Sequence, residues 1–245
     1  MKEDCFETIQ TKEASLPERT AEQISKLIVE QQLTGEDRLP SEFELAQLLG
    51  VGRGTIREGV KLLVARNVLE IRRGKGTYIA QNPGEVSDPL GFAYYPDQLQ
   101  LALDLLEVRT QLEPWVARAA AERATAENLR QLREICSVVE RDILEGRDHS
   151  KNDVAFHVAI ARCTQNLVVP KLIPIITYAV TLFVSLTESR LKTETIVVHR
   201  EILDAIAAGD GGKAQEAMRQ HMEYNRVLLE QIIREQREEK PRGAS

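Results

Sequence analysis

Residues 49–63 read LGVGRGTIREGVKLL, and the three glycines at the start of this stretch allow two interpretations. They cradle a nucleotide phosphate, or they shape a turn that leads into a helix with basic residues. A dinucleotide fingerprint needs glycine at its first, third and sixth positions, but the sixth position counted from Gly50 is Thr55. The residues after Gly54 do not provide the lysine of a P-loop either. Phosphate cradling is therefore the weaker interpretation.

Two helices are predicted on the N-terminal side of the glycines. Residues 20–33 carry apolar side chains at helical spacing, with Thr20 as the N-cap and Gln23 at the capping-box position. After a turn, Ser41 begins a second helix, which Gly50 ends. The glycines therefore follow a helix and do not follow a strand.

A third helix and a hairpin are predicted on the C-terminal side. The helix runs from residue 53 to about residue 66, with an apolar stripe along it. Two β-prone runs, 68–73 and 77–80, follow it and are separated by the turn 74–76, which has a basic tip. Residues 20–80 therefore have the pattern of a winged helix-turn-helix.

In such a domain the second helix of the motif enters the major groove with its first residues toward the base edges. Here those residues are Arg53, Thr55 and Arg57. Arginine can bind guanine through O6 and N7, whereas Gly52 and Gly54 let the backbone approach phosphate closely. We therefore expect the glycines to let the backbone approach double-stranded DNA.

The charge distribution favours the same partner. The chain has a net charge of −6, which by itself argues weakly against nucleic acid. Between residues 53 and 75, however, seven basic residues stand against two acidic ones, a local balance of +5. A basic island of this kind is typical of a DNA-binding surface, and the alternative is a basic helix face that only contacts solvent.

Residues 39–79, LPSEFELAQLLGVGRGTIREGVKLLVARNVLEIRRGKGTYI, resemble the DNA-binding domain of GntR-type bacterial transcription regulators. The chain departs from that family at Phe43, where many members have an arginine, and at Gly52, where Ser or Thr is common. A lost phosphate contact weakens binding without changing the base code. The resemblance implies DNA contacts from Arg53, Thr55, Arg57, Arg73 and Gly74.

The remainder of the chain is predicted to be helical. Residues 81–98 are rich in Pro, Gly and turn formers and form a linker. Six helices are expected, at 99–123, 126–146, 150–164, 167–189, 193–208 and 213–236. A C-terminal tail (237–245) follows them, and an N-terminal tail (1–19) precedes the winged domain. The expected fold class is therefore mainly α: a winged helix-turn-helix followed by an all-α antiparallel helical bundle over residues 99–236.

Three further features concern the location of the chain. The N-terminus lacks an apolar core, so we expect no signal peptide and a cytoplasmic protein. The apolar stretch 167–186 is interrupted by Lys171 and two prolines, so it predicts a central bundle helix and no membrane span. The three cysteines are scattered and odd in number, which favours reduced thiols.

Three of the four histidines have a suggestive spacing. Asp153 and His157 lie four residues apart, on one face of a helix. If the sequence GDGG at 209–212 reverses a helical hairpin, His199 and His221 each lie about 14 Å from the turn and meet at one height. Three imidazoles and a carboxylate suit a divalent transition metal, with zinc preferred and nickel or manganese as alternatives. The other interpretation is a set of satisfied core residues.

Residues 99–236 resemble the helical effector domain, called FCD, of the GntR subgroup named for the fatty-acid regulator. The resemblance implies a metal bound by Asp153, His157, His199 and His221, with a small carboxylate or sugar-acid effector beside it. Arg109 matches a frequent pocket arginine of these domains, although an ion pair with Glu113 is the alternative. Asn225 is a further candidate for the effector pocket.

These observations predict a ligand-responsive transcription regulator that acts as a repressor and binds a palindromic operator as a homodimer. One rival is a metal-dependent enzyme acting on a small organic acid, but the helix around His157 offers no spare carboxylate or lysine as a general base. We therefore expect no catalytic residues. A second rival is an architectural DNA-binding protein with a structural metal and no effector.

Overall fold

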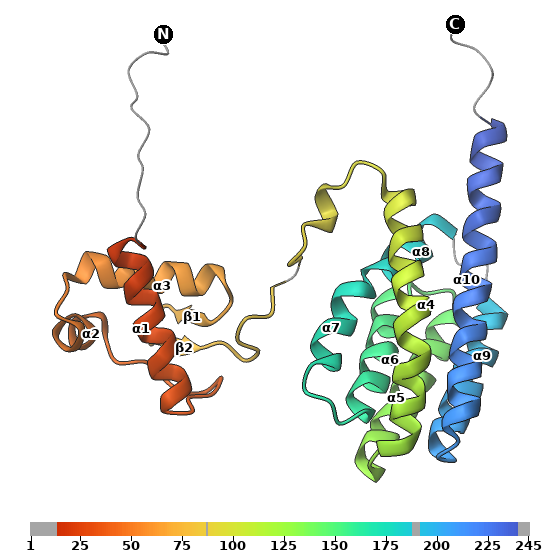
Figure 1. Cartoon of the computed structure of the whole chain (residues 1–245), viewed down its shortest axis with the longest axis horizontal. Coiled ribbons are helices and arrows are strands. Elements are labelled where there is room, and N and C mark those ends of the chain that lie inside the picture. The colour runs from red at the N-terminus through yellow and green to blue at the C-terminus, as the bar shows by residue number, and fades with distance from the viewer. Residues whose placement is uncertain (1–13, 87, 188–191, 240–245) are drawn as a thin grey trace, which may run out of the picture. The chain divides into compact units, whose positions relative to one another are not determined.

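The computed structural model describes residues 14–86, 88–187 and 192–239. They divide into two compact units, which meet in the sequence between Pro89 and Leu90 (Figure 1). Each unit has its own hydrophobic core, so each is described by itself.

The N-terminal unit is a winged helix-turn-helix, as predicted. The hairpin strands pair antiparallel, with Leu69 opposite Ile79 and Arg72 opposite Gly76. Apolar residues of every element, among them the buried Ile24, form one core. The elements are α1 (Leu16–Glu30), α2 (Glu42–Leu49), α3 (Arg53–Ala65), β1 (Leu69–Arg72) and β2 (Gly76–Ile79).

The first helix begins earlier than the sequence pattern predicted. Ser15 is its N-cap and forms a capping box with Glu18, so the assignment of that role to Thr20 was wrong. Thr20 is buried inside α1, and its hydroxyl donates to the carbonyl of Leu16 at 2.8 Å. The cap lies at Ser15 because Pro17 can occupy the first helical turn, where no amide donor is needed.

The C-terminal unit is a helical bundle, which confirms the mainly α class. Its core contains Phe156, Ile202 and Met222, and α4 packs along α10. The elements are a short 3-10 helix, η2 (Phe92–Tyr94), followed by α4 (Gln98–Arg123), α5 (Ala126–Leu144), α6 (Ser150–Cys163), α7 (Val169–Ile176), α8 (Tyr178–Thr187), α9 (Lys192–Ala207) and α10 (Gly211–Glu239).

The helix predicted at 167–189 is divided in two, and its last two residues lie outside the described residues. Pro174 has no amide to donate to the preceding turn. The Thr177 hydroxyl then donates to the carbonyl of Ile173 at 2.9 Å, and α7 ends there. In the described part of the chain, no helix has the length and apolar character to cross a membrane.

Two of the cysteines can be placed. Cys136 and Cys163 are free thiols inside the bundle. Burial raises the pKa of each thiol to about 11, so both are protonated and unreactive at neutral pH. Cys5 lies outside the described residues.

Candidate metal centre and DNA-reading surface

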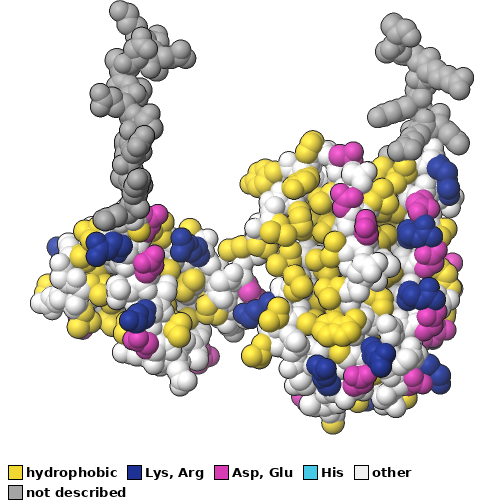
Figure 2. Space-filling model, viewed as in Figure 1, with side chains coloured by type: hydrophobic (Ala, Val, Ile, Leu, Met, Phe, Trp, Pro, Cys, Tyr) yellow, Lys and Arg dark blue, Asp and Glu magenta, His cyan; other side chains and the backbone are white. Residues whose placement is uncertain are grey.

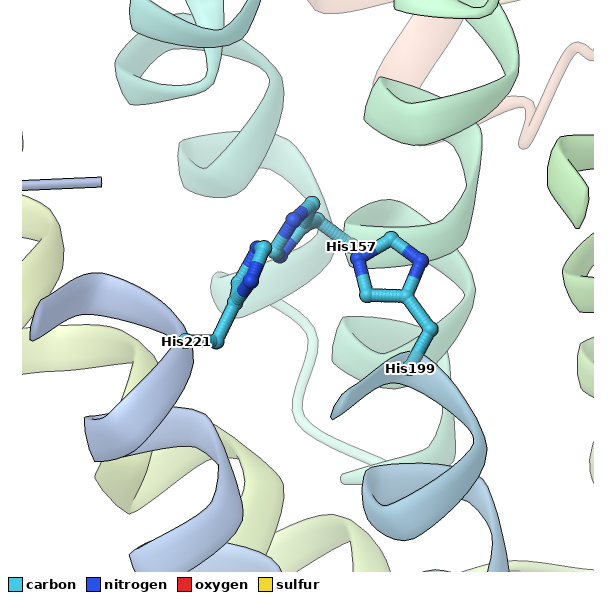
Figure 3. Close-up of side chains that lie close together, drawn as sticks. All are labelled: His157, His199 and His221. Atoms are coloured by element: carbon cyan, nitrogen blue, oxygen red, sulfur yellow. The ribbon is translucent and has the colours of Figure 1, made fainter. Parts of the chain in front are cut away.

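Three histidines from three helices meet inside the bundle. His157 comes from α6, His199 from α9 and His221 from α10, and Figure 3 shows their rings turned toward one another. One nitrogen of each lies within 4.8 Å of the others. All three side chains are buried. The turn between α9 and α10 brings His199 and His221 together, with their ring centroids 4.9 Å apart.

Asp153 completes the cluster from one helical turn before His157. Its Oδ1 lies 3.4 Å from His199 Nε2, and its Oδ2 lies 3.9 Å from His157 Nε2. The four residues that spacing had singled out are therefore neighbours in space. The ring of Phe156 stacks on that of His199 at 4.1 Å and holds it in place from the side.

The polar atoms of this cluster fit a divalent transition metal. The buried polar atoms without a hydrogen bond are Asp153 Oδ1, His157 Nδ1, both ring nitrogens of His199 and Nε2 of His221, although His157 Nδ1 lies against the carboxylate of Glu113. Buried polar atoms left in this state are costly, and a metal ion would satisfy them. Burial first, and then the neighbouring imidazoles, lowers the pKa of His199 and of His221 well below the usual value for histidine. Both are therefore neutral at pH 7, which is the form that binds a metal.

A buried ion pair on α4 adjoins the cluster. Arg109 pairs through Nε with Oε1 of Glu113, and the side chains are 1% and 2% exposed. The other carboxylate oxygen of Glu113 contacts Nδ1 of His157. Arg109 Nη2 lies 3.2 Å from Nε2 of the same ring. The ion pair anticipated as the alternative for Arg109 is thus present, and it is part of the histidine cluster.

Glu113 is the residue whose place at the site the sequence did not reveal. Burial alone would raise the pKa of its carboxyl, but the guanidinium of Arg109 and the ring of His157 hold that pKa well below its ordinary range. The available signal was a polar pair, Arg109 and Glu113, within the buried stripe of α4. His149, which had no partner by spacing, is also buried and lies at the start of α6.

Asn225 lies one turn beyond His221 on α10 and is buried. Its position on the helix agrees with a place beside the cluster. The C-terminal unit contains all of these residues: the three clustered histidines, Asp153, Arg109 and Asn225.

The start of α3 presents polar side chains to solvent. Arg53 and Arg57 are exposed and Thr55 is half-buried. The guanidinium of Arg57 donates to both carboxylate oxygens of Glu42, at 3.2 and 2.8 Å. One of the predicted base-reading arginines therefore has an intramolecular partner on α2.

The glycines of the opening stretch have different reasons to be present. Gly50 closes α2 in the left-handed conformation, with φ of 65°, which favours glycine. Gly52 and Gly54 have no such requirement, and a Cβ at either would meet no atom within 4 Å. Among the residues that the structure describes, none restricts a side chain at these two positions, so the space beside them is open to a partner.

The wing presents a basic tip. The amide of Lys75 donates to the carbonyl of Arg72 at 2.9 Å and closes the turn. Gly74 lies in that turn with φ of 74°, and Arg73 is exposed beside it. Arg72 itself lies over the ring of Tyr78, 4.3 Å from the centroid. Exposed cations on both the wing and α3 are the arrangement that phosphate contacts need.

The winged helix-turn-helix and the helical domain together define a DNA-binding regulator. The family described as "Bacterial regulatory proteins, gntR family" matches residues 16–79, and the FCD domain matches residues 104–224. The chain belongs to the GntR family and has a C-terminal FCD domain.

Individual relatives agree with this assignment. The chain is 30% identical over 212 residues to the Uxu operon transcriptional regulator of Escherichia coli (strain K12), covering 82% of this chain and 81% of that one. It is 27% identical to the Galactonate operon transcriptional repressor of the same strain, covering 79% and 88%. The solved structure of Streptococcus agalactiae GntR is 36% identical, with a TM-score of 0.75 and coverage of 86% and 99%.

Proposed function

We propose that this protein is a repressor of a catabolic operon that a small carboxylate or sugar acid releases from DNA. The observation that carries the proposal is the buried cluster of three histidines and Asp153, which has unsatisfied polar atoms and in which Arg109 contacts His157. A metal-ligating set and a carboxylate-binding side chain meet there, in a chain that begins with a DNA-binding domain. The protein acts in the cytoplasm, where its operator is.

The DNA partner is a palindromic operator bound by a homodimer. One short recognition helix reads few base pairs, and two-fold symmetry doubles the contact. Val108 and Trp115 are exposed apolar side chains on α4. Hydrophobic side chains gather on the face of the C-terminal unit seen in Figure 2, which supports a second copy of the chain as partner. The contacts to DNA come from Arg53, Thr55, Arg57, Arg73 and Gly74.

The metal is a divalent transition ion, zinc in the first place and nickel or manganese as alternatives. Its ligands are Asp153, His157, His199 and His221. Such an ion would supply Lewis acidity at this site. Glu113 holds His157 from the opposite side of the ring, in the manner of the outer-shell carboxylates that orient metal-binding histidines.

The effector is a small acid held by Arg109 and Asn225. A guanidinium matches the two oxygens of a carboxylate, and it binds more strongly inside a protein than in water. The name of the galactonate relative supports a sugar acid. Release from DNA requires that the acid bind the DNA-free form more tightly than the operator-bound form.

The test combines two measurements on the intact protein. Fluorescence anisotropy with the DNA upstream of its own gene should show salt-resistant specific binding, and one acid should release that DNA only from metal-loaded protein. A thermal-shift panel of hydroxy acids, dicarboxylates and sugar acids, with and without chelator, identifies that acid. The absence of specific DNA binding would refute the proposal that the protein is a transcription regulator. Turnover of an acid that His199→Ala abolishes would establish a metalloenzyme in its place.

A further inference from the structure

His157 is held between two side chains of α4 with opposite hydrogen-bonding roles. Its Nδ1 contacts the carboxylate of Glu113, and its Nε2 lies 3.2 Å from Nη2 of Arg109. A carboxylate only accepts and a guanidinium only donates. The tautomer that suits both partners has its proton on Nδ1, facing the carboxylate, and directs the lone pair of Nε2 at Arg109.

That lone pair is also the one that the cluster offers to a metal. Nε2 is the His157 atom paired with Asp153, at 3.9 Å, while Nδ1 is engaged with Glu113 on the other side of the ring. A neutral imidazole has one nitrogen lone pair in the ring plane. It cannot accept the Arg109 N–H and ligate a metal at the same time.

We propose that Arg109 and the metal compete for His157, so that metal loading is what frees the Arg109 guanidinium to bind the acid. This inference rests on the proposed function and specifies its order of events: metal first, acid second. When His157 Nε2 becomes a ligand, Arg109 gives up that hydrogen bond. Its Nε remains paired with Glu113, so the guanidinium stays at the site with Nη2 available.

The sign of the competition separates it from a purely structural role of Arg109. As a competitor, Arg109 occupies a ligand lone pair and places a positive charge beside a dication, so its removal tightens metal binding. If Arg109 served only to hold Glu113, and through it His157, its removal would disorder the ligand and weaken metal binding.

The deciding experiment measures the Zn²⁺ affinity of the full-length protein by chelator competition, without any acid. We expect Arg109→Met to bind Zn²⁺ roughly 10-fold more tightly than the wild type, the size of an outer-shell effect. The matched control is Arg118→Met, because Arg118 forms the same i,i+4 pair with Glu122 on the same helix but is exposed. That control should leave the affinity unchanged.

A second pair of variants covers the case in which Arg109→Met does not fold because Glu113 has lost its partner. Glu113→Gln can still accept from His157, so Arg109→Met/Glu113→Gln is compared with Glu113→Gln alone, and the double variant should again bind Zn²⁺ more tightly. Equal or weaker binding on removal of Arg109 in a folded protein overturns the competition while leaving the proposed function intact. Absence of Zn²⁺ binding in all variants refutes the metal site and the competition together.

Discussion

Two arginine–glutamate pairs, one in each unit, differ in what surrounds them. Arg57 and Glu42 pair on the DNA-reading surface, with side chains 60% and 37% exposed. Arg109 and Glu113 pair inside the bundle, where the side chains are 1% and 2% exposed. An exposed pair contributes about 0–1 kcal/mol, so Arg57 can exchange its partner for DNA at little cost. Removal of one member of a buried pair costs about 3–5 kcal/mol, so Arg109 changes partner only when another group enters the same site.

Removal of Glu113 tests the buried pair most severely. Glu113→Ala leaves the Arg109 charge uncompensated in the core, and we expect the free energy of unfolding of the bundle to fall by about 3–5 kcal/mol. Urea unfolding followed by circular dichroism measures the change. Glu122→Ala, on the same helix and in the exposed pair with Arg118, should lose less than about 1 kcal/mol. Equal losses in the two variants would remove the distinction between the pairs.

Metal removal tests the cluster next to that pair. Chelator should lower the melting temperature of the wild type, since a ligand at 100 times its Kd stabilises the folded state by about 2.7 kcal/mol. His199→Ala should melt at the same temperature with and without metal. The matched histidine is His149, which is buried but outside the triad, and His149→Ala should keep the metal-dependent shift. Loss of the metal-dependent shift in both variants would show that His149 is also required for metal binding.

Removal of Arg57 tests the exposed pair through its function. Arg57→Ala should weaken binding of the operator by about 1–3 kcal/mol and relax its sequence preference, because a base contact is lost. Anisotropy titrations with operator and scrambled DNA measure both effects. Arg19→Ala removes the same charge from the exposed surface of α1 and should leave the preference intact. Uniform weakening on all sequences would make Arg57 a phosphate contact.

The smallest effect is expected from the partner of Arg57. Glu42→Gln removes the carboxylate that holds the guanidinium, so operator affinity should increase, by at most about 1 kcal/mol. Glu22→Gln makes the same change in net charge on α1 and serves as the reference in the same titration. A decrease specific to Glu42→Gln would mean that the pair orients Arg57 for DNA and does not restrain it.

The signals that the sequence carried reliably were local ones. Ser41 and Glu44 form the capping box of α2, and Gly50 closes that helix, through contacts that span only a few residues. The basic turn of the hairpin is local in the same sense. The error at the first helix was also local: Thr20 was assigned the cap that Ser15 forms, and Thr20 is instead buried inside α1.

By itself, then, the sequence determined a winged helix-turn-helix, a helical C-terminal domain and three histidines at matching positions, because periodicity, caps and spacing along a helix are set by near neighbours. Only the tertiary structure decided that Glu113 contacts His157 and that Arg57 is paired with Glu42. Each of those contacts joins two different helices, so it depends on how the helices rotate and pack. That rotation follows from the whole core, which no short pattern of residues encodes.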